Sequence, residues 1–113
     1  MDSNLSTADG YLIDDEYALA VEWYDKAVKT AVNDLKYVFA HRAKAYLNLK
    51  NFKKSLQDCL FALELDAAYE PVYYRQGICY FELEEYESAK NAFELGEKLR
   101  LQGGYYTTYH LPK

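Results

Sequence analysis

The stretch NFKKSLQDCLFALELD at residues 51–66 returns in altered form as EYESAKNAFELGEKLR at residues 85–100. In both stretches an aromatic residue is followed three positions later by a small one, and then by apolar or small residues at the spacing of one helix face. The equivalent pairs are Phe52 with Tyr86, Ser55 with Ala89, Cys59 with Phe93, Ala62 with Gly96, and Leu65 with Leu99. Self-similarity at a period of about 34 residues indicates a helical repeat architecture.

The match continues upstream, where Ala43 is equivalent to Gly77 and Tyr46 to Tyr80, and a third copy stands at the start of the chain. The residues of this first copy and their equivalents in the second are Ala8 with Ala43, Tyr11 with Tyr46, Tyr17 with Phe52, Ala20 with Ser55, Tyr24 with Cys59, and Ala27 with Ala62. Each copy contains two helical patterns joined by a short polar turn. The three turns fall at residues 14–16, 50–52 and 84–86.

Small residues on the two helices of each copy predict how the helices pack, because short side chains let antiparallel helices approach to about 8–10 Å. They are Ala8, Ala43 and Gly77 on the first helices and Ala20, Ser55 and Ala89 on the second. A single helical hairpin cannot bury its apolar face alone, so we expect an all-α array of three hairpins stacked in a right-handed superhelix. The expected repeats span about residues 2–35, 36–69 and 70–99, and a C-terminal tail spans residues 100–113.

The composition excludes several classes of protein. A chain of 113 residues with a net charge of −5 is one small domain without the basic stripe that nucleic-acid binding requires. No apolar run approaches the roughly 20 residues of a membrane span, and the first residues lack the features of a signal peptide. Cys59 and Cys79 lie in helical patterns without CxxC spacing, so we expect reduced, buried thiols, with a disulfide or metal role as the alternative. This predicts a cytoplasmic protein, with the nucleus as a second location.

No combination of residues predicts catalysis, a cofactor or a metal. The two histidines, His41 and His110, are far apart in the sequence, and the cysteines occupy core positions. Gly103 and Gly104 follow a helical pattern and open no new one, unlike the glycines of a phosphate-binding loop. The acidic runs lack the spacing of calcium ligands. The sequence therefore predicts that the protein is not an enzyme.

The small residues at positions 8, 20 and 27 of each copy and the aromatic residues at positions 11, 17 and 24 resemble the tetratricopeptide repeat family. Three repeats of this kind cover nearly the whole chain. The resemblance implies a scaffold for protein–protein interaction, and it does not by itself name a partner.

Longer stretches resemble the N-terminal repeat domain of a family of co-chaperones, the suppressors of the G-two allele of Skp. They are YLIDDEYALAVEWYDKAV, HRAKAYLNLKNFKKSLQDCLFALELD and YYRQGICYFELEEYESAKNAFELGEKL. This resemblance implies an adaptor that links heat-shock protein 90 machinery to Skp-containing ubiquitin ligases. The repeat domain would hold the ligase subunit or a second copy of itself. A general co-chaperone that binds acidic chaperone tails and a self-associating scaffold are the alternatives.

The first helices of the repeats are expected to line a concave groove, where proteins of this class hold an extended peptide or a partner helix. The residues expected to face it are Leu5, Ser6, Asp9, Ile13, Tyr37, His41, Lys44, Asn48, Tyr74, Arg75, Ile78 and Glu82. Lys44, Arg75 and His41 form a predicted positive spot for acidic or hydroxyl groups. The alternative is that Lys44 and Arg75 pair with Asp9 and Glu82 and keep the groove soluble. His41 is expected to be packed or to face a turn. Trp23 is expected to be half-buried at the outer face, with an exposed anchor for a partner as the alternative.

Many tetratricopeptide repeat domains hold the acidic tails of heat-shock proteins 70 and 90 in a two-carboxylate clamp. Carried over by resemblance, the five clamp positions fall on Leu5, Asp9, His41, Pro71 and Arg75, of which only Arg75 keeps the family's residue. An aspartate in place of an amide would cost about 1–4 kcal/mol against a carboxylate at about 4 Å. We therefore predict that this domain does not bind those tails.

The tail GGYYTTYHLPK begins with a glycine pair that is expected to end the last helix. Tyr105, Tyr106 and Tyr109 are then expected to pack on the open face of the last repeat in place of a capping helix. Without that packing, an exposed apolar patch would favour self-association.

Overall fold

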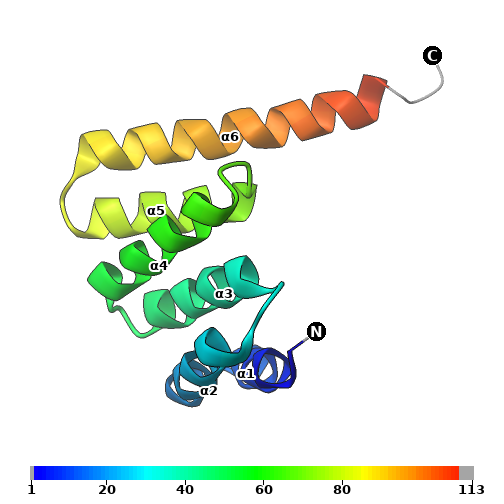
Figure 1. The fold of residues 1–113 in the computed structure, drawn as a ribbon. Helices are drawn as coiled ribbons and strands as arrows, with labels where there is room; N and C mark the ends of the chain where they lie inside the picture. Colours follow the sequence, from blue (N-terminus) through cyan, green and yellow to red (C-terminus); the bar gives the residue numbers. More distant parts are fainter. Residues whose placement is uncertain (1, 110–113) are drawn as a thin grey trace.

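The computed structural model describes the backbone of residues 2–109 and the side chains of residues 2–103. The described part is all-α and forms three helical hairpins stacked one on the next (Figure 1). The helices are α1 (Ser3–Ile13), α2 (Tyr17–Thr30), α3 (Leu35–Asn48), α4 (Phe52–Leu65), α5 (Glu70–Glu82) and α6 (Tyr86–Tyr109). The predicted fold class is confirmed.

The turn inside each hairpin has the same backbone conformation. Asp15, Lys50 and Glu84 have φ values of 60°, 60° and 64°. In every turn the N–H of the next residue donates to the carbonyl oxygen five residues before it, at 2.8–2.9 Å. This contact satisfies carbonyl groups at the helix end, and it offsets the left-handed conformation of a residue that is not glycine. The sequence period therefore reappears as a structural period.

The small residues of each hairpin are buried as predicted. Ala8, Ala20 and Ala43 are fully buried, and Ala89 is 2% exposed. The hydroxyl of Ser55 on α4 donates to the carbonyl oxygen of Ala43 on α3 at 2.7 Å, a contact that only a close helix approach allows. Pro71 lies in the first turn of α5, where its missing N–H leaves no hydrogen bond unmade.

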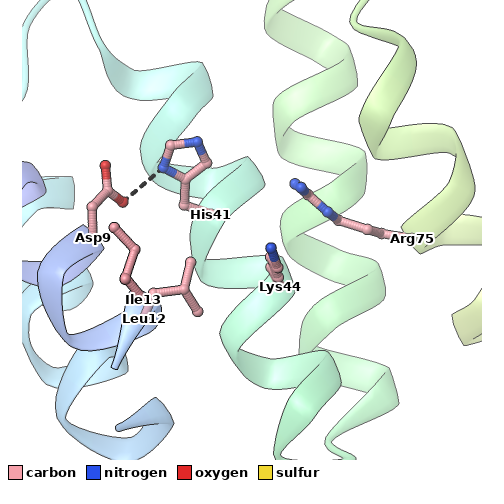
Figure 2. Close-up of a pocket in the computed structure, with 6 residues that line it drawn as sticks. All are labelled: Asp9, Leu12, Ile13, His41, Lys44 and Arg75. Carbon is pink, nitrogen blue, oxygen red and sulfur yellow. Dashed lines mark hydrogen bonds and ion pairs between the residues drawn. The ribbon is translucent and has the colours of Figure 1, made fainter. Parts of the chain in front are cut away.

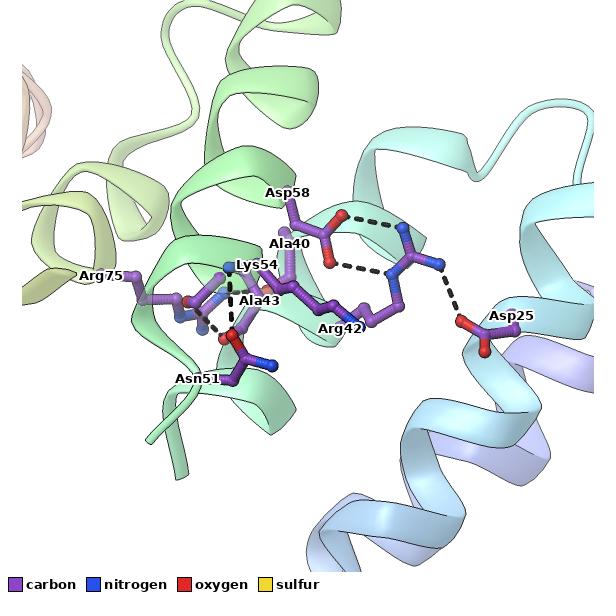
Figure 3. A network of polar contacts seen from close by, with 9 residues as sticks. Asp25, Ala40, Arg42, Ala43, Asn51, Lys54, Asp58 and Arg75 are labelled. Atoms are coloured by element: carbon purple, nitrogen blue, oxygen red, sulfur yellow. Dashed lines mark hydrogen bonds and ion pairs between the residues drawn. The ribbon is translucent and has the colours of Figure 1, made fainter. Parts of the chain in front are cut away.

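A buried ion pair joins the two helices of the second hairpin, and the hydrophobic pattern gave no signal for it. Asp58 on α4 has a side chain that is 3% exposed, and both of its carboxylate oxygens accept from the Arg42 guanidinium at 2.8 Å. The same guanidinium donates to Asp25 on α2 at 2.9 Å (Figure 3). Arg42 thereby connects α2, α3 and α4 through one side chain.

The predicted end of the last helix at the glycine pair is wrong, because α6 continues through Gly103 and Gly104 to Tyr109. A helical glycine costs only about 1 kcal/mol relative to alanine, and it ends a helix only when it takes a left-handed conformation. No described glycine has that conformation. His110 and the side chains of the tail tyrosines lie outside the described part, so their packing stays a prediction.

The outer face of α6 is polar where α4 is apolar. Leu56, Leu60 and Leu63 of α4 are replaced at equivalent positions by Lys90, Glu94 and Glu97, all three exposed. A charged outer face on the last helix keeps the end of the described array soluble, as the polar outer face of a capping helix does. Within the part of the chain described here, we find no helix that combines the length and hydrophobicity of a membrane span.

Candidate functional site

Two adjoining depressions on the face formed by α1, α3 and α5 make up the candidate site, and His41 is their common wall. The Lys44 depression has a volume of about 230 Å³ and is lined by Asp9, Leu12, Ile13, His41, Lys44 and Arg75. The Tyr37 depression has a volume of about 410 Å³ and is lined by Leu5, Asp34, Tyr37, His41 and Tyr69. We call the two together the inner groove. Figure 2 shows residues of α1, α3 and α5 around the Lys44 depression.

Asp9 is held by two hydrogen bonds from different helices. Its Oδ1 accepts from the Tyr24 hydroxyl at 2.5 Å and is 2.8 Å from Nδ1 of His41. Burial acts to raise the pKa of Asp9, but the contacts with His41 and Tyr24 outweigh it and lower that pKa. Burial and the bond to Asp9 raise the pKa of Tyr24. Asp9 is therefore a fixed negative charge in the groove, and His41 is packed as predicted.

Lys44 and Arg75 contribute two positive charges to the same depression. Nη1 of Arg75 donates to the carbonyl oxygen of Ala40 at 2.8 Å, which fixes the guanidinium. Burial lowers the pKa of Arg75, but a guanidinium stays charged in proteins. Lys44 is exposed and has no ion-pair partner among the described residues. The alternative pairing of these cations with Asp9 and Glu82 is not among the ion pairs of the described residues. Asp9 contacts His41 and Tyr24 instead.

The structure brings seven of the twelve predicted groove residues to the two depressions, namely Leu5, Asp9, Ile13, Tyr37, His41, Lys44 and Arg75. The other five, which include Ser6, are not among the residues that line them. The Asn48 amide donates to the carbonyl oxygen of Lys44 at 2.9 Å, and the Tyr74 hydroxyl to Glu97 at 3.3 Å. Ile78 and Glu82 are exposed further along α5.

Sequence reasoning missed Leu12, Asp34 and Tyr69 as groove residues. Asp34 and Tyr69 immediately precede α3 and α5, so the helical face pattern does not include them. The rings of Tyr37 and Tyr69 meet edge to face at 5.7 Å. The Lys36 ammonium lies 5.0 Å from the first ring centroid and 5.3 Å from the second. The sequence feature that could have identified Asp34 and Tyr69 is their position immediately before α3 and α5, two helices that line the groove.

The five clamp positions carried over from the family do not form a clamp here. Leu5 is 1% exposed and belongs to the core. Asp9 puts a carboxylate in the groove, and Pro71 offers no donor. Arg75 alone presents a cation, already fixed by the Ala40 carbonyl.

The fold and the inner groove define a protein-binding repeat module. A family model described as tetratricopeptide repeat matches residues 70–102, and the chain belongs to the tetratricopeptide repeat family.

Among curated proteins, the chain is 36% identical over 91 residues to "Protein SGT1 homolog" of Oryza sativa subsp. japonica, covering 80% of this chain and 24% of that protein. It is 30% identical over 89 residues to "Hsp70-Hsp90 organizing protein 3" of Arabidopsis thaliana, covering 79% of this chain and 16% of that protein. The chain thus spans a quarter or less of either relative.

Two solved structures show the same fold. The second repeat domain of Spaghetti (RPAP3), bound to the HSP90 peptide SRMEEVD, has a TM-score of 0.81 at 28% identity, covering 86% of this chain and 89% of that one. The Sgt2 repeat domain from Aspergillus fumigatus has a TM-score of 0.80 at 26% identity, covering 88% and 65%. The chain is thus a repeat module of the kind found in co-chaperones.

Proposed function

We propose that this chain is the protein-binding module of a chaperone-associated adaptor and that its inner groove holds a subunit of a Skp-containing ubiquitin ligase. Heat-shock protein 90 machinery would be engaged by other parts of the adaptor, in the cytoplasm and the nucleus. The module positions its partner and carries out no reaction. The likeness to the rice SGT1 homolog supports this choice.

The observation that carries the proposal is the state of the clamp positions. Asp9 holds a negative charge on the wall of the inner groove, beside the place where the family's clamp takes a carboxylate. With Leu5 buried and Pro71 lacking a donor, Arg75 is left as the one clamp cation. A groove of this kind selects against an acidic chain end and leaves its surface for a folded or internal partner segment.

Binding of acidic chaperone tails is the second candidate, because structural neighbours of this chain bind such tails. The first and second repeat domains of RPAP3 are both described with the HSP90 peptide SRMEEVD, at TM-scores of 0.80 and 0.81. The fold is therefore compatible with that ligand, and the side chains of the groove decide between the two candidates.

Calorimetric titration of the chain with a purified Skp-type subunit, beside the peptide SRMEEVD, tests the proposal. We expect binding heat with the subunit and none with the peptide. Asp9→Asn removes the repelling charge, and we expect it to weaken the exclusion of the peptide. Micromolar binding of the peptide by the unaltered chain, with none of the subunit, would replace our proposal with the second candidate.

A further inference from the structure

We propose that the inner groove recognises an internal segment of its partner that presents one acidic side chain to the Lys44 depression and one apolar or aromatic side chain to the Tyr37 depression. This inference rests on the proposed function and names the chemistry of the partner that the groove takes.

The charges of the Lys44 depression call for a single carboxylate. Lys44 and Arg75 contribute two positive charges, and Asp9 contributes one negative charge. The excess is one positive charge, which one acidic side chain neutralises, whereas a second carboxylate would meet Asp9 without a partner. Lys44 is exposed and lacks an ion-pair partner in the described part of the chain, so it can turn toward a ligand without breaking an existing bond.

The apolar lining of the Lys44 depression supports the same choice. Leu12 is half-buried and Ile13 is 79% exposed, so the part of the α1 wall beside Asp9 is apolar. Figure 2 shows this wall facing the two cations across the depression. An acidic side chain with apolar methylene groups would contact the apolar wall while its carboxylate reaches the cations.

The Tyr37 depression is suited to an apolar or aromatic side chain rather than to a cation. Its rings, Tyr37 and Tyr69, offer faces and edges for packing, and Leu5 forms part of its wall. The carboxylate of Asp34, which also lines it, already accepts from the backbone N–H of Asp2 at 3.2 Å. The Lys36 ammonium already lies over both rings and pairs with Asp66 at 2.7 Å. A cationic side chain would therefore meet a like charge at the position where an aromatic ring attracts it.

The two depressions adjoin at His41, so one extended segment can occupy both. In an extended segment, residues i and i+2 project on the same side about 6–7 Å apart. The segment we infer therefore carries an apolar or aromatic residue and an acidic residue separated by one position. The carboxylate of this segment belongs to a side chain within the partner's chain, which distinguishes the segment from an acidic chain end.

The experiment uses the full chain and short fluorescent peptides whose two ends are blocked by acetyl and amide groups. The first peptide carries phenylalanine, glycine and glutamate in sequence, and the others carry glutamine or lysine in place of the glutamate, or glycine in place of the phenylalanine. We expect the glutamate peptide to bind best in fluorescence anisotropy. We expect about a five- to tenfold loss with lysine and a smaller one with glutamine.

Lys44→Glu provides the decisive variant, because Lys44 is exposed and has no ion-pair partner in the described part of the chain. We expect this variant to prefer the lysine peptide over the glutamate peptide. Lys53→Glu is the matched control, since Lys53 is exposed on α4 and the net charge changes equally. An unchanged preference in Lys44→Glu, or an equal change in Lys53→Glu, would overturn the inference.

Titration of the same two variants with the Skp-type subunit separates the inference from the proposed function. A subunit that binds all variants equally, with no peptide preference, would overturn the inference and leave the function standing. A clear peptide preference without binding of the subunit would support the inference and remove that partner.

Discussion

Arg42→Met is expected to destabilise the fold by about 3–5 kcal/mol, because it leaves Asp58 buried without its partner. The Asp58 side chain is 3% exposed and receives two hydrogen bonds at 2.8 Å from the Arg42 guanidinium. Methionine keeps an unbranched apolar side chain in place of the Arg42 stem but removes the guanidinium, whose carbon lies 5.7 and 5.9 Å from the ring centroids of Phe39 and Tyr46. Urea unfolding followed by circular dichroism at 222 nm measures the free energy of unfolding.

Two further variants and a change of pH test this explanation. Asp25→Asn removes only the half-exposed partner of Arg42, so we expect a cost below about 1 kcal/mol. Replacing both buried partners, with Arg42→Met and Asp58→Leu together, should recover most of the stability.

Burial raises the pKa of Asp58 while Arg42 acts to lower it, so loss of Arg42 raises that pKa further. A carboxyl group whose pKa is raised on folding lowers stability as the pH rises through that value, so the deficit of Arg42→Met should shrink in acid. A deficit that stays constant with pH, or a double variant no more stable than the single one, would contradict the account.

Gly77→Val is expected to destabilise the chain by about 2–3 kcal/mol through overpacking. A Cβ atom at this position would lie 2.6 Å from Cε1 of Phe93, closer than two non-bonded carbon atoms can approach. The two preceding repeats carry alanine here, and the middle repeat has Cys59 where the last has Phe93. Of the three repeats, the last therefore has the smallest residue at this position, facing the phenylalanine ring of Phe93 on α6.

Gly10→Val is the matched control, because a Cβ atom at Gly10 meets nothing within 4 Å. We expect little change or a slight gain there, since valine is a somewhat better helix former than glycine. Shortening the facing ring with Phe93→Leu should relieve part of the cost of Gly77→Val. If Gly10→Val and Gly77→Val cost the same in thermal unfolding, the close contact with Phe93 is not the reason for the glycine.

The fold was largely predictable because the period of the repeat, the small residues and the turns all indicate the same arrangement of helices. The period of about 34 residues predicted three hairpins, and the buried small residues and the three matching turns confirm them. The end of α6 was not predictable from Gly103 and Gly104, because two glycines lower helix stability without forbidding a helix. The Arg42–Asp58 pair was hidden because burial of a charge depends on a partner from another helix.

The groove was predictable only in its middle. Helical periodicity places Asp9, His41 and Lys44 on inner faces, and all three line a depression. Periodicity cannot assign a residue in front of a helix, so Asp34 and Tyr69 were missed. Helical periodicity also does not show which side chain a charged residue contacts. The contacts of Asp9 with His41 and Tyr24 are therefore known only from the structure.

Chemical-shift mapping with a Skp-type subunit tests most directly whether the inner groove is the partner surface. In ¹H–¹⁵N spectra of the labelled chain, we expect the largest changes at backbone amides around the two depressions, such as those of Ile13, Tyr37 and Lys44. We expect the amides of Trp23 and Phe61, on α2 and α4, to remain unchanged. Changes centred on α2, α4 and α6 with the inner groove silent would contradict the account.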